Sequence, residues 1–359
     1  MEANSDPGAS LPAWQARPVR VLLAPDAFAG TLTAPEAADA LAAGWSRAAP
    51  GDALTAVPLS DGGPGFLEVL TRARSAATLV PATVADPLGR PVPAAVLLDG
   101  ADAYVESAEA CGLHLLAAGE RDPERTSTRG VGELLAAAVA TGATRVVVGL
   151  GGSATHDGGR GAVEALGRAW PAAVELVVAS DVDVPLADAA FFAAQKGARP
   201  EQLPRLAARL DAWADELEVA TGRRVRRRDG AGAAGGLGFG LLALGGHRAP
   251  GIGVVADAVG LRACIAAVDL VITGEGRYDA TSLRGKVCGG VARLAQEAGV
   301  PCLVLAGGIE VGVREARAAG VDEMRSAAEL AGSPEAAQRR PAHWLAELAA
   351  RAATRWSRG

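Results

Sequence analysis

The fold class is indicated first by residues 269–275, Asp-Leu-Val-Ile-Thr-Gly-Glu, in which a short apolar run ends in a glycine and a carboxylate. Four similar runs end in a carboxylate or a glycine cluster, and they lead to Asp26, Asp61, Asp157 and Asp181. Short apolar runs bounded by turn residues are typical of buried strands. Because Ala/Leu-rich stretches of helical period lie between them, the order of segments predicts an α/β fold with a parallel sheet and covering helices.

Further elements extend this alternation. The capping box Thr33-Ala34-Pro35-Glu36 predicts the start of a helix. Residues 81–99, rich in valine around an Asp-Pro-Leu-Gly-Arg-Pro turn, predict a β-hairpin, and residues 334–357 predict a final helix. The expected strands are Val19–Ala24, Leu54–Leu59, Arg145–Gly149, Glu175–Ala179, Asp269–Thr273 and Pro301–Ala306, and the other expected helices are Val131–Thr141, Gly161–Trp170 and Val287–Ala298.

Length and composition favour a globular enzyme of two or three domains. The chain has 359 residues, of which 50% are hydrophobic, and a formal net charge of −6, which disfavours a general nucleic-acid binder. No apolar run reaches membrane-spanning length, and residues 1–18 have the composition of a disordered tail rather than of a signal peptide. The four cysteines show no CxxC spacing, so we expect reduced thiols and a cytoplasmic location.

The carboxylates at the strand ends predict a cation site. The carboxyl ends of parallel strands meet at one edge of a sheet, where ligands bind. A single Asp in such a position commonly caps a helix, but several carboxylates at one edge repel each other unless a cation lies between them. Mg²⁺ prefers such oxygen ligands.

Two glycine-rich stretches fit a dinucleotide-binding pattern incompletely. Residues 149–154 follow an expected strand but lack the ribose-binding acid, and residues 230–235 do not follow a strand. A P-loop is excluded because Gly285-Lys286 is followed by Val287. Both stretches remain suitable for holding an anion with backbone N–H groups, although close helix packing would equally explain residues 230–235.

The densest chemistry lies between residues 274 and 286. Glu275, Arg277, Asp279 and Lys286 follow one strand, and Lys286 is one of only two lysines among 35 basic residues. In a chain that otherwise uses arginine, a retained lysine indicates a site that needs a compact ammonium group. Arginine suits a carboxylate, lysine a transferring phosphoryl group, and aspartate a metal or a hydroxyl proton.

Together these motifs resemble the glycerate kinases of the bacterial type-1 kind, in order from about Val19 to about Glu323. Both lysines, Lys196 and Lys286, lie within them. The motifs are Ala24-Pro25-Asp26, Asp61-Gly62-Gly63, Glu106 with Cys111-Gly112-Leu113, Thr126-Ser127, Gly151-Gly152-Ser153-Ala154-Thr155, Asp157-Gly158-Gly159, Gln195-Lys196-Gly197, Gly230–Gly236 and Thr273-Gly274-Glu275-Gly276-Arg277 followed by Asp279 and Gly285-Lys286.

The resemblance implies phosphorylation of glycerate by ATP with Mg²⁺, usually at the 2-hydroxyl. It also implies two α/β domains with the active site in the cleft between them. One would be a discontinuous, doubly wound parallel sheet built from both chain ends, residues 19–80 and 265–359, and the other an inserted middle domain, residues 81–264. A monomer or homodimer without nucleic-acid or membrane partners is expected.

On this basis each candidate residue receives a role. Lys286, Asp279 and Asp181 are expected to be catalytic, and Asp181 and Glu275 to bind the metal. Arg277, Asp26, Asp61, Gly62 and Gly63 are expected to bind the acid substrate. The residues expected to bind the nucleotide are Gly151, Gly152, Ser153, Lys196 and Gly232.

Four departures from the family pattern leave the acceptor open. Ala29 replaces the usual lysine, Pro64 and Phe66 replace a Glu and a Thr, His156 replaces an Asn, and the segment 187–194 is shortened and has lost its glycines. A kinase for another small hydroxy acid is therefore one alternative, and a catalytically silent protein that binds a nucleotide or metabolite is another. A nicotinamide oxidoreductase is a remote further alternative, since it rests only on the two incomplete glycine patterns.

Overall fold

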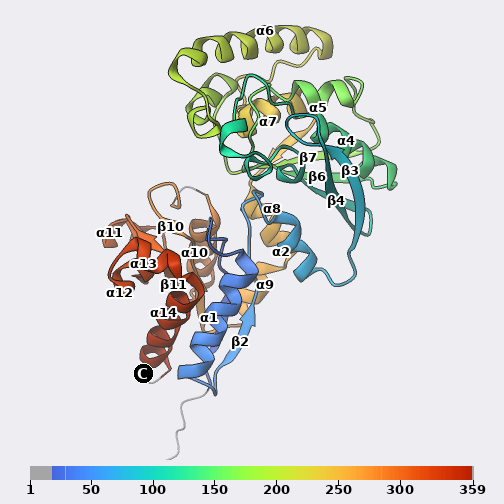
Figure 1. Cartoon of the computed structure of the whole chain (residues 1–359). Coiled ribbons are helices and arrows are strands. Elements are labelled where there is room, and N and C mark those ends of the chain that lie inside the picture. The colour runs from blue at the N-terminus through green and yellow to red at the C-terminus, as the bar shows by residue number, and fades with distance from the viewer. Residues whose placement is uncertain (1–17, 29, 284, 358–359) are drawn as a thin grey trace, which may run out of the picture.

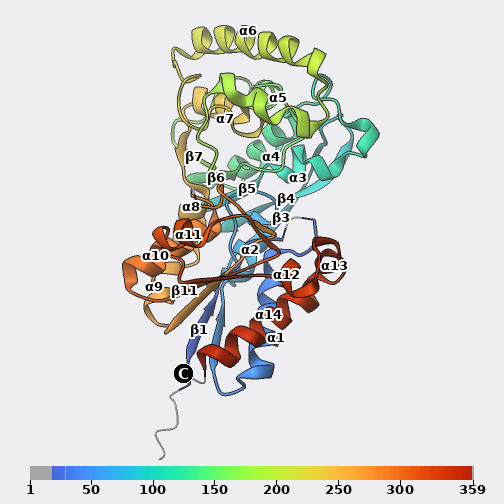
Figure 2. The ribbon, with the colours of Figure 1, turned by 90° about the vertical axis from the view of Figure 1, so that its left-hand side faces the viewer.

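The computed structural model describes residues 18–28, 30–283 and 285–357, and it consists of two lobes, each built on its own sheet. As they lie in Figure 1, we call the lobe with the five-stranded sheet the lower lobe and the one with the six-stranded sheet the upper lobe. Figure 2 shows the same two lobes from the side. Apart from Pro18, the predicted tail lies outside the described residues, and so does Ala29.

The lower lobe contains the parallel sheet predicted from the strand runs. All four of its strand pairs are parallel, in the order β13-β11-β9-β1-β2. Its strands are β1 (Arg20–Leu23), β2 (Ala53–Ala56), β9 (Leu270–Thr273), β11 (Cys302–Ala306) and β13 (Glu323–Ser326), and a separate two-stranded ladder joins β10 (Arg277–Tyr278) to β12 (Gly308–Ile309).

Helices cover both faces of this sheet, which explains why its strands are uninterrupted apolar runs. Val21 and Leu23 of β1 point into the core under α1 and α14, whereas Leu22 between them joins the core on the opposite face, with α9 and α10. The helices of this lobe are α1 (Ala34–Ala48), α2 (Phe66–Ala73), α8 (Gly251–Ala258), α9 (Leu261–Ala266), α10 (Val287–Ala298), α11 (Val313–Ala318), α12 (Ala327–Ala331), α13 (Pro334–Arg339) and α14 (Pro341–Trp356).

The upper lobe has a mixed sheet in the order β3 to β8. The predicted hairpin forms its antiparallel edge, and the other strands run parallel. Its strands are β3 (Thr78–Ala85), β4 (Pro91–Asp99), β5 (Asp102–Glu106), β6 (Arg145–Gly149), β7 (Glu175–Ala179) and β8 (His247–Ala249). Its helices are α3 (Ala108–Cys111), α4 (Arg129–Ala140), α5 (Arg160–Ala165), α6 (Leu203–Thr221) and α7 (Ala233–Ala243).

The two lobes share part of one apolar core. Phe66, at the start of α2, is fully buried, and its ring meets that of Tyr104 on β5 edge to face at 6.2 Å. The same core reaches Val147 and Val177 of the upper sheet and Ile252 of α8. The lobes are therefore joined by packed side chains as well as by the chain crossings.

The α/β fold class is confirmed, with one sheet taken from both chain ends and one from the middle of the chain. The division at residues 80/81 and 264/265 stays a prediction. β3 already begins at Thr78, and α8 and α9 pack against α10 of the lower lobe.

Two predicted helices differ from the expectation: one is divided in two, and the other ends early. The final helix over 334–357 is two helices, because Pro341 begins α14 after Arg340 leaves helical geometry (φ −141°, ψ 60°). The helix predicted over 161–170 ends at Ala165, before Gly167 (φ 67°) and Arg168 (φ 61°), both in the left-handed region. In the part of the chain that the structure describes, no helix has the length and apolar character needed to cross a membrane.

Candidate active site

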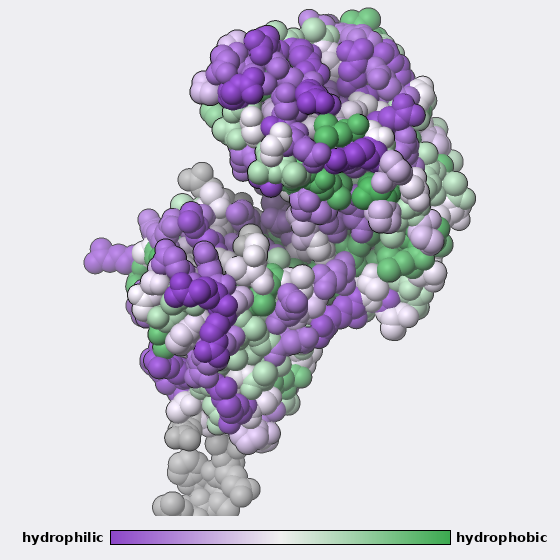
Figure 3. Space-filling view, viewed as in Figure 1, coloured by the Kyte–Doolittle hydropathy of each residue, from purple (hydrophilic) through white to green (hydrophobic). Residues whose placement is uncertain are grey.

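A cavity of about 1010 Å³ lies at the carboxyl edge of the five-stranded sheet, the edge that faces the upper lobe. The segments that follow β1, β2, β9 and β11 make its wall together with residues of α12, α13 and α14. Figure 3 shows that the molecular surface is hollowed between the two lobes. The predicted site residues that line the cavity are Asp26, Asp61, Gly63, Glu275, Arg277, Asp279 and Lys286.

Three of the five strand-end carboxylates gather at this edge, those of Asp26, Asp61 and Glu275, whereas Asp157 and Asp181 follow strands β6 and β7 of the other sheet and do not line the cavity. The backbone N–H of Asp26 donates to the carbonyl of Gly274 at 2.8 Å, so the loops after β1 and β9 are tied together. Burial raises the pKa of Asp26 well above its usual value, and the charges of Asp61 and then Glu275 raise it further. Burial also raises the pKa of Glu275, against hydrogen bonds with Ser282 and Cys288 that lower it, and among the described residues its buried Oε1 has no hydrogen-bond partner. The site therefore holds more negative charge than its own side chains neutralise.

A divalent cation fits this arrangement only if few protein side chains bind it. Among residues 18–28, 30–283 and 285–357, no cluster of three or more His, Cys, Asp or Glu side chains could hold a metal ion. Mg²⁺ is commonly held by one or two carboxylates together with substrate phosphates. The orphaned Oε1 of Glu275 and the mutually repelling Asp26 and Asp61 fit that mode of binding.

Lys286 supplies positive charge to this acidic edge. It is the residue that precedes α10, in extended geometry (φ −75°, ψ 177°), and it lines the cavity. Its ammonium group lies near enough to lower the pKa of three carboxyls, those of Asp26, Glu275 and Asp279. A lysine in this position can approach a bound phosphoryl group while the carboxylates hold a metal.

Arg277 and Asp279 lie on and beside the short strand β10. The Nε of Arg277 pairs with Glu310 at 3.4 Å, and most of its side chain is exposed. Asp279 accepts hydrogen bonds from the hydroxyl and the backbone N–H of Thr281, at 2.6 and 2.8 Å, and these bonds lower its pKa. Asp279 therefore stays ionised and is a poor proton acceptor.

The corner formed by residues 61–65 connects the cavity to the upper lobe. Asp61 accepts a hydrogen bond from the backbone of Gly63, and Pro64 lines the cavity. Gly62 does not line it; its φ of +94° needs glycine, and a Cβ there would approach the carbonyl of Ala179 to 3.0 Å. The backbone conformation of this corner therefore requires glycine at position 62.

Glu106 holds this corner in place, a role that the sequence did not assign. It ends β5 in the upper lobe, is 6% exposed, and accepts hydrogen bonds from the backbone of Gly65 (3.1 and 3.2 Å) and Leu67 (3.2 Å) at the start of α2. Burial raises its pKa to about 7, against these hydrogen bonds. Its place at a strand end is the same signal that identified Asp26 and Asp61.

Asp181 lies next to this site but not in the wall of the cavity. It accepts hydrogen bonds from the backbone of Gly251 (2.8 Å) and Ile252 (3.3 Å), and so it caps the start of α8. Burial, and after it the nearby charge of Asp61, raise its pKa to about 7. The resolved charge interactions thus form a row from Glu275 through Asp26 and Asp61 to Asp181.

The residues predicted to bind nucleotide lie in the upper lobe, and none of them lines the cavity. Gly151 and Gly152 nevertheless abut its corner. A Cβ on Gly151 would lie 2.4 Å from the Cα of Gly63, and one on Gly152 would lie 2.6 Å from the Cγ of Pro64. Only glycine permits this approach between the lobes.

Lys196 and Gly232 make close contacts within the upper lobe. Lys196 is 3% exposed, and its Nζ donates to the hydroxyl of Ser153 at 2.9 Å and to the carbonyl of Thr155 at 2.7 Å. Burial lowers its pKa to about 8. A Cβ on Gly232 would lie 2.5 Å from the carbonyl of Pro185. Lys196 braces the loop after β6, and Gly232 permits close packing.

The departures from the family pattern lie in different places. Pro64 lines the cavity, whereas Phe66 is fully buried in the core, so of these two residues only Pro64 contributes to the cavity wall. His156 is buried in the upper lobe, and the shortened segment forms a 3₁₀ helix over Leu186–Phe192.

Comparison with known proteins gives one consistent result. The model of the glycerate kinase family matches this chain over residues 21–172 and 168–357. An uncharacterized protein of Mycobacterium tuberculosis is 45% identical, over 94% of this chain and 91% of the relative. A glycerate kinase of Bacillus subtilis is 38% identical (81% and 85%), and a glycerate 2-kinase of Escherichia coli is 36% identical (86% and 90%).

A solved structure agrees with these sequence matches. The crystal structure of a protein assigned as glycerate kinase 2 from Salmonella typhimurium LT2 superposes with a TM-score of 0.78 at 32% identity, covering 95% of this chain and 99% of that one. The similarity therefore extends over both lobes.

Proposed function

The chain belongs to the glycerate kinase family, whose members transfer a phosphoryl group to a hydroxyl, and we propose that it uses ATP to phosphorylate glycerate, giving 2-phosphoglycerate. The observation that carries the proposal is the convergence of Lys286, Arg277 and the carboxylates Asp26, Asp61 and Glu275 on one cavity. At about 1010 Å³, this cavity is at the upper end of the range of ligand pockets, so it has room for a nucleotide and a small acid together.

The two cations of the cavity suit the two anionic reactants. Arg277 would bind the carboxylate of glycerate, because most of its side chain is exposed and a guanidinium has five N–H donors, of which the contact with Glu310 uses the Nε. Lys286 would bind the transferring phosphoryl group as a compact charge. In phosphoryl transfer such positioning and charge neutralisation supply most of the catalysis.

The proton of the attacking hydroxyl needs a carboxylate acceptor. Asp279, one of our predicted catalytic residues, has a lowered pKa and suits an orienting role near Lys286. Asp26 lines the same cavity and has a raised pKa, so it is the better proton acceptor. Asp181 has a raised pKa too, but its carboxylate caps α8 outside the cavity wall.

Mg²⁺ would be held by one or two carboxylates of the acidic row together with substrate phosphates; Glu275 and Asp181 are the predicted ligands, and of these two Glu275 lines the cavity. When bound, the ion supplies neutralisation of the charge on the phosphate oxygens. The support for this assignment is the buried Oε1 of Glu275, which has no hydrogen-bond partner among the residues that the structure describes.

The nucleotide would extend across the cavity. The end formed by α12, α13 and the start of α14 is mostly apolar and suits a base; it is lined by Ala327, Ala328, Pro334, Ala337, Pro341 and Leu345. From there the phosphates would run toward Lys286 and the Gly63–Pro64 corner. Gly151, Gly152 and Ser153 would then approach the phosphates from the upper lobe, with Lys196 and Gly232 supporting that loop and its surroundings.

We further propose a cytoplasmic location and a monomeric or homodimeric state. The support for a reducing compartment is that all four cysteines are free thiols and three of them are buried.

The test is to identify the product by phosphorus NMR after incubation with D-glycerate, ATP and Mg²⁺. We expect 2-phosphoglycerate, and we expect Lys286→Ala to lower kcat by about 10²- to 10³-fold. Arg293→Ala is the matched control, since Arg293 lies on α10, the helix that Lys286 precedes, and pairs with Glu297 on its exposed side. Equal turnover in Lys286→Ala and the control would refute the role of Lys286.

A panel of small hydroxy acids tests the acceptor. Pro64 in the cavity wall is the observation that favours a different acid. If another acid is phosphorylated much faster than glycerate, the substrate proposal is wrong while the kinase assignment stands. ATP binding without any phosphorylated product would instead support the silent alternative.

A further inference from the structure

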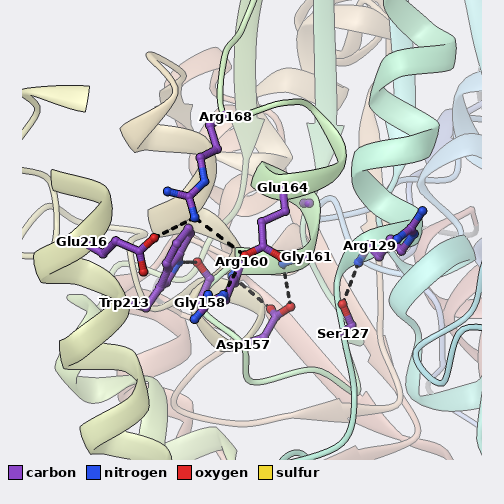
Figure 4. A network of polar contacts seen from close by, with 12 residues as sticks. Ser127, Arg129, Asp157, Gly158, Arg160, Gly161, Glu164, Arg168, Trp213 and Glu216 are labelled. Carbon is purple, nitrogen blue, oxygen red and sulfur yellow. Dashed lines mark hydrogen bonds and ion pairs between the residues drawn. The ribbon is translucent and has the colours of Figure 1, made fainter. Parts of the chain in front are cut away.

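The upper lobe contains a second, smaller cavity of about 170 Å³, between the loop after β6 and helix α6. The residues of its wall that matter here are His156, Asp157, Arg160, Arg209, Trp213 and Glu216. Figure 4 shows four of these wall residues, Asp157, Arg160, Trp213 and Glu216. The cavity shares no lining residue with the larger one.

His156 is the unusual residue of this cavity. It is 1% exposed, and within the described chain neither its Nδ1 nor its Nε2 has a hydrogen-bond partner. A buried polar group without a partner costs free energy, and nearly all such groups in folded proteins are paired. Burial, with the charges of Lys196 and Arg209, lowers the pKa of His156 to about 4. The ring is therefore neutral at pH 7, with one N–H to donate and one nitrogen to accept.

The acids of the wall are already engaged. Asp157 accepts hydrogen bonds from the backbone of Thr128 (2.8 Å) and Gly161 (3.1 Å). Glu216 pairs with Arg168 at 2.7 Å, as Figure 4 shows. Glu216 is thus paired with a cation, and the charge of Asp157 is stabilised by backbone N–H donors.

The two arginines of the wall have N–H donors that are not bonded to any described residue. Arg160 uses its Nε toward Glu164 at 2.8 Å and lies over the ring of Trp213 at 5.1 Å, and Arg209 uses its Nη1 toward the carbonyl of Glu124 at 3.0 Å. Each guanidinium has five N–H donors, and these bonds occupy only one on each within the described residues. The wall thus offers N–H donors from two cations and both functions of a neutral imidazole.

We propose that this cavity binds a small oxyanion that also carries a hydroxyl, such as hydrogen phosphate or a short hydroxy acid. Its oxygens would accept from Arg160 and Arg209, and its hydroxyl would pair with the acceptor nitrogen of His156. At about 170 Å³ the cavity is smaller than the usual range of ligand pockets, about 300–1,000 Å³, so it suits a small ion rather than a nucleotide.

Binding of an anion at this site would affect the larger cavity through the short loop from Gly152 to His156. His156 follows Ser153 and Thr155, which Lys196 holds, and Gly152 at the start of the loop abuts Pro64. This consequence rests on the proposed function; binding of the anion itself does not.

Inorganic phosphate is the probe, and the imidazole nitrogen resonances of the ¹⁵N-labelled full-length chain are the readout. We expect phosphate to shift the resonances of His156 but not those of the exposed His247. In Arg209→Gln the dissociation constant should rise about tenfold or more, because a hydrogen bond to a charged group is lost. Arg205→Gln is the matched control, since Arg205 lies one turn earlier on α6 and pairs with Glu124 outside the cavity wall.

Lys286→Ala separates this site from the larger cavity, because the response of His156 to phosphate should persist there. Repeating the titration with glycerate distinguishes a phosphate site from a hydroxy-acid site. The proposal fails if His156 does not respond to either anion, or if Arg209→Gln binds as tightly as the control. Loss of the response in Lys286→Ala would assign the anion to the larger cavity and would also overturn it.

Discussion

The carboxylate of Asp61 raises the pKa of Asp26, and this charge effect is second only to the burial of Asp26 itself. The two residues follow the neighbouring strands β1 and β2, which end at the same edge of the sheet. The cavity thus contains like charges, and their mutual repulsion does not stabilise the ligand-free protein. Such an arrangement is typical of sites that bind a cation or transfer a proton.

Asp26→Asn should therefore stabilise the free protein at neutral pH while removing activity. The folded pKa of Asp26 lies above the ordinary value of 3.8, so between these values the folded state binds more protons than the unfolded state, and stability falls as the pH rises. Asparagine removes that cost. Thermal unfolding from pH 3 to 8 should show a higher Tm for the variant at pH 7 and no advantage below about pH 4.

The activity of the same variant separates a catalytic role from a structural one. We expect kcat to fall by about 10²- to 10⁴-fold if Asp26 accepts the hydroxyl proton. A variant that is stabilised and fully active would contradict that role.

Arg277→Ala should raise the KM for the acid about 10- to 100-fold, with a smaller effect on the KM for ATP. The reason is the loss of a charge-assisted hydrogen bond to the substrate carboxylate. Steady-state kinetics with each substrate varied in turn measure both constants. Arg314→Ala, on α11 and outside the cavity wall, is the control. A larger change for ATP than for the acid would move Arg277 to the nucleotide.

Sequence reasoning found the cavity-lining edge of the lower sheet because its signals are local. An apolar run predicts a strand buried on both faces, as Val21 and Leu22 show, and the residue that ends it is then carried to the ligand-binding edge. Asp26, Asp61 and Glu275 were found in this way. Glu106 gives the same signal, but its hydrogen bonds to Gly65 and Leu67 depend on the contact between lobes.

The two lysines show why the rest could not be predicted. Their scarcity singles out Lys196 and Lys286 equally, yet Lys286 lines the cavity and Lys196 is buried against a loop of its own lobe. Asp181 similarly has the strand-end position but caps α8, a helix that begins 70 residues later. Tertiary packing decides which groups Lys196 and Asp181 contact, and a local sequence pattern carries no information about that packing.

Gly44→Ala should destabilise the lower lobe strongly. Helix α1 packs against α14 at this glycine, where a Cβ would lie 2.0 Å from the carbonyl oxygen of Ala346. Relieving that overlap requires the helices to separate, which costs about 1–3 kcal/mol or more. Gly51→Ala is the matched control, because a Cβ there meets nothing within 4 Å. Urea unfolding followed by circular dichroism should show a lower midpoint for Gly44→Ala alone, and equal midpoints would refute the close approach.

Lys196→Met decides between a phosphate-binding lysine and a brace for the loop after β6. A brace predicts a loss of about 1–3 kcal/mol, because the carbonyl of Thr155 is left buried without its donor, and only a modest rise in the KM for ATP. A phosphate ligand predicts the reverse, a KM for ATP raised tenfold or more at nearly unchanged stability. The pH dependence adds a second readout. The folded pKa of Lys196 is lowered from 10.5 to about 8, so the unfolded state binds more protons between these values, and the wild-type chain should gain stability as the pH rises from 8 toward 10.5. Lys196→Met should lack this gain, and an identical gain in both proteins would show that Lys196 is not buried as the structure describes.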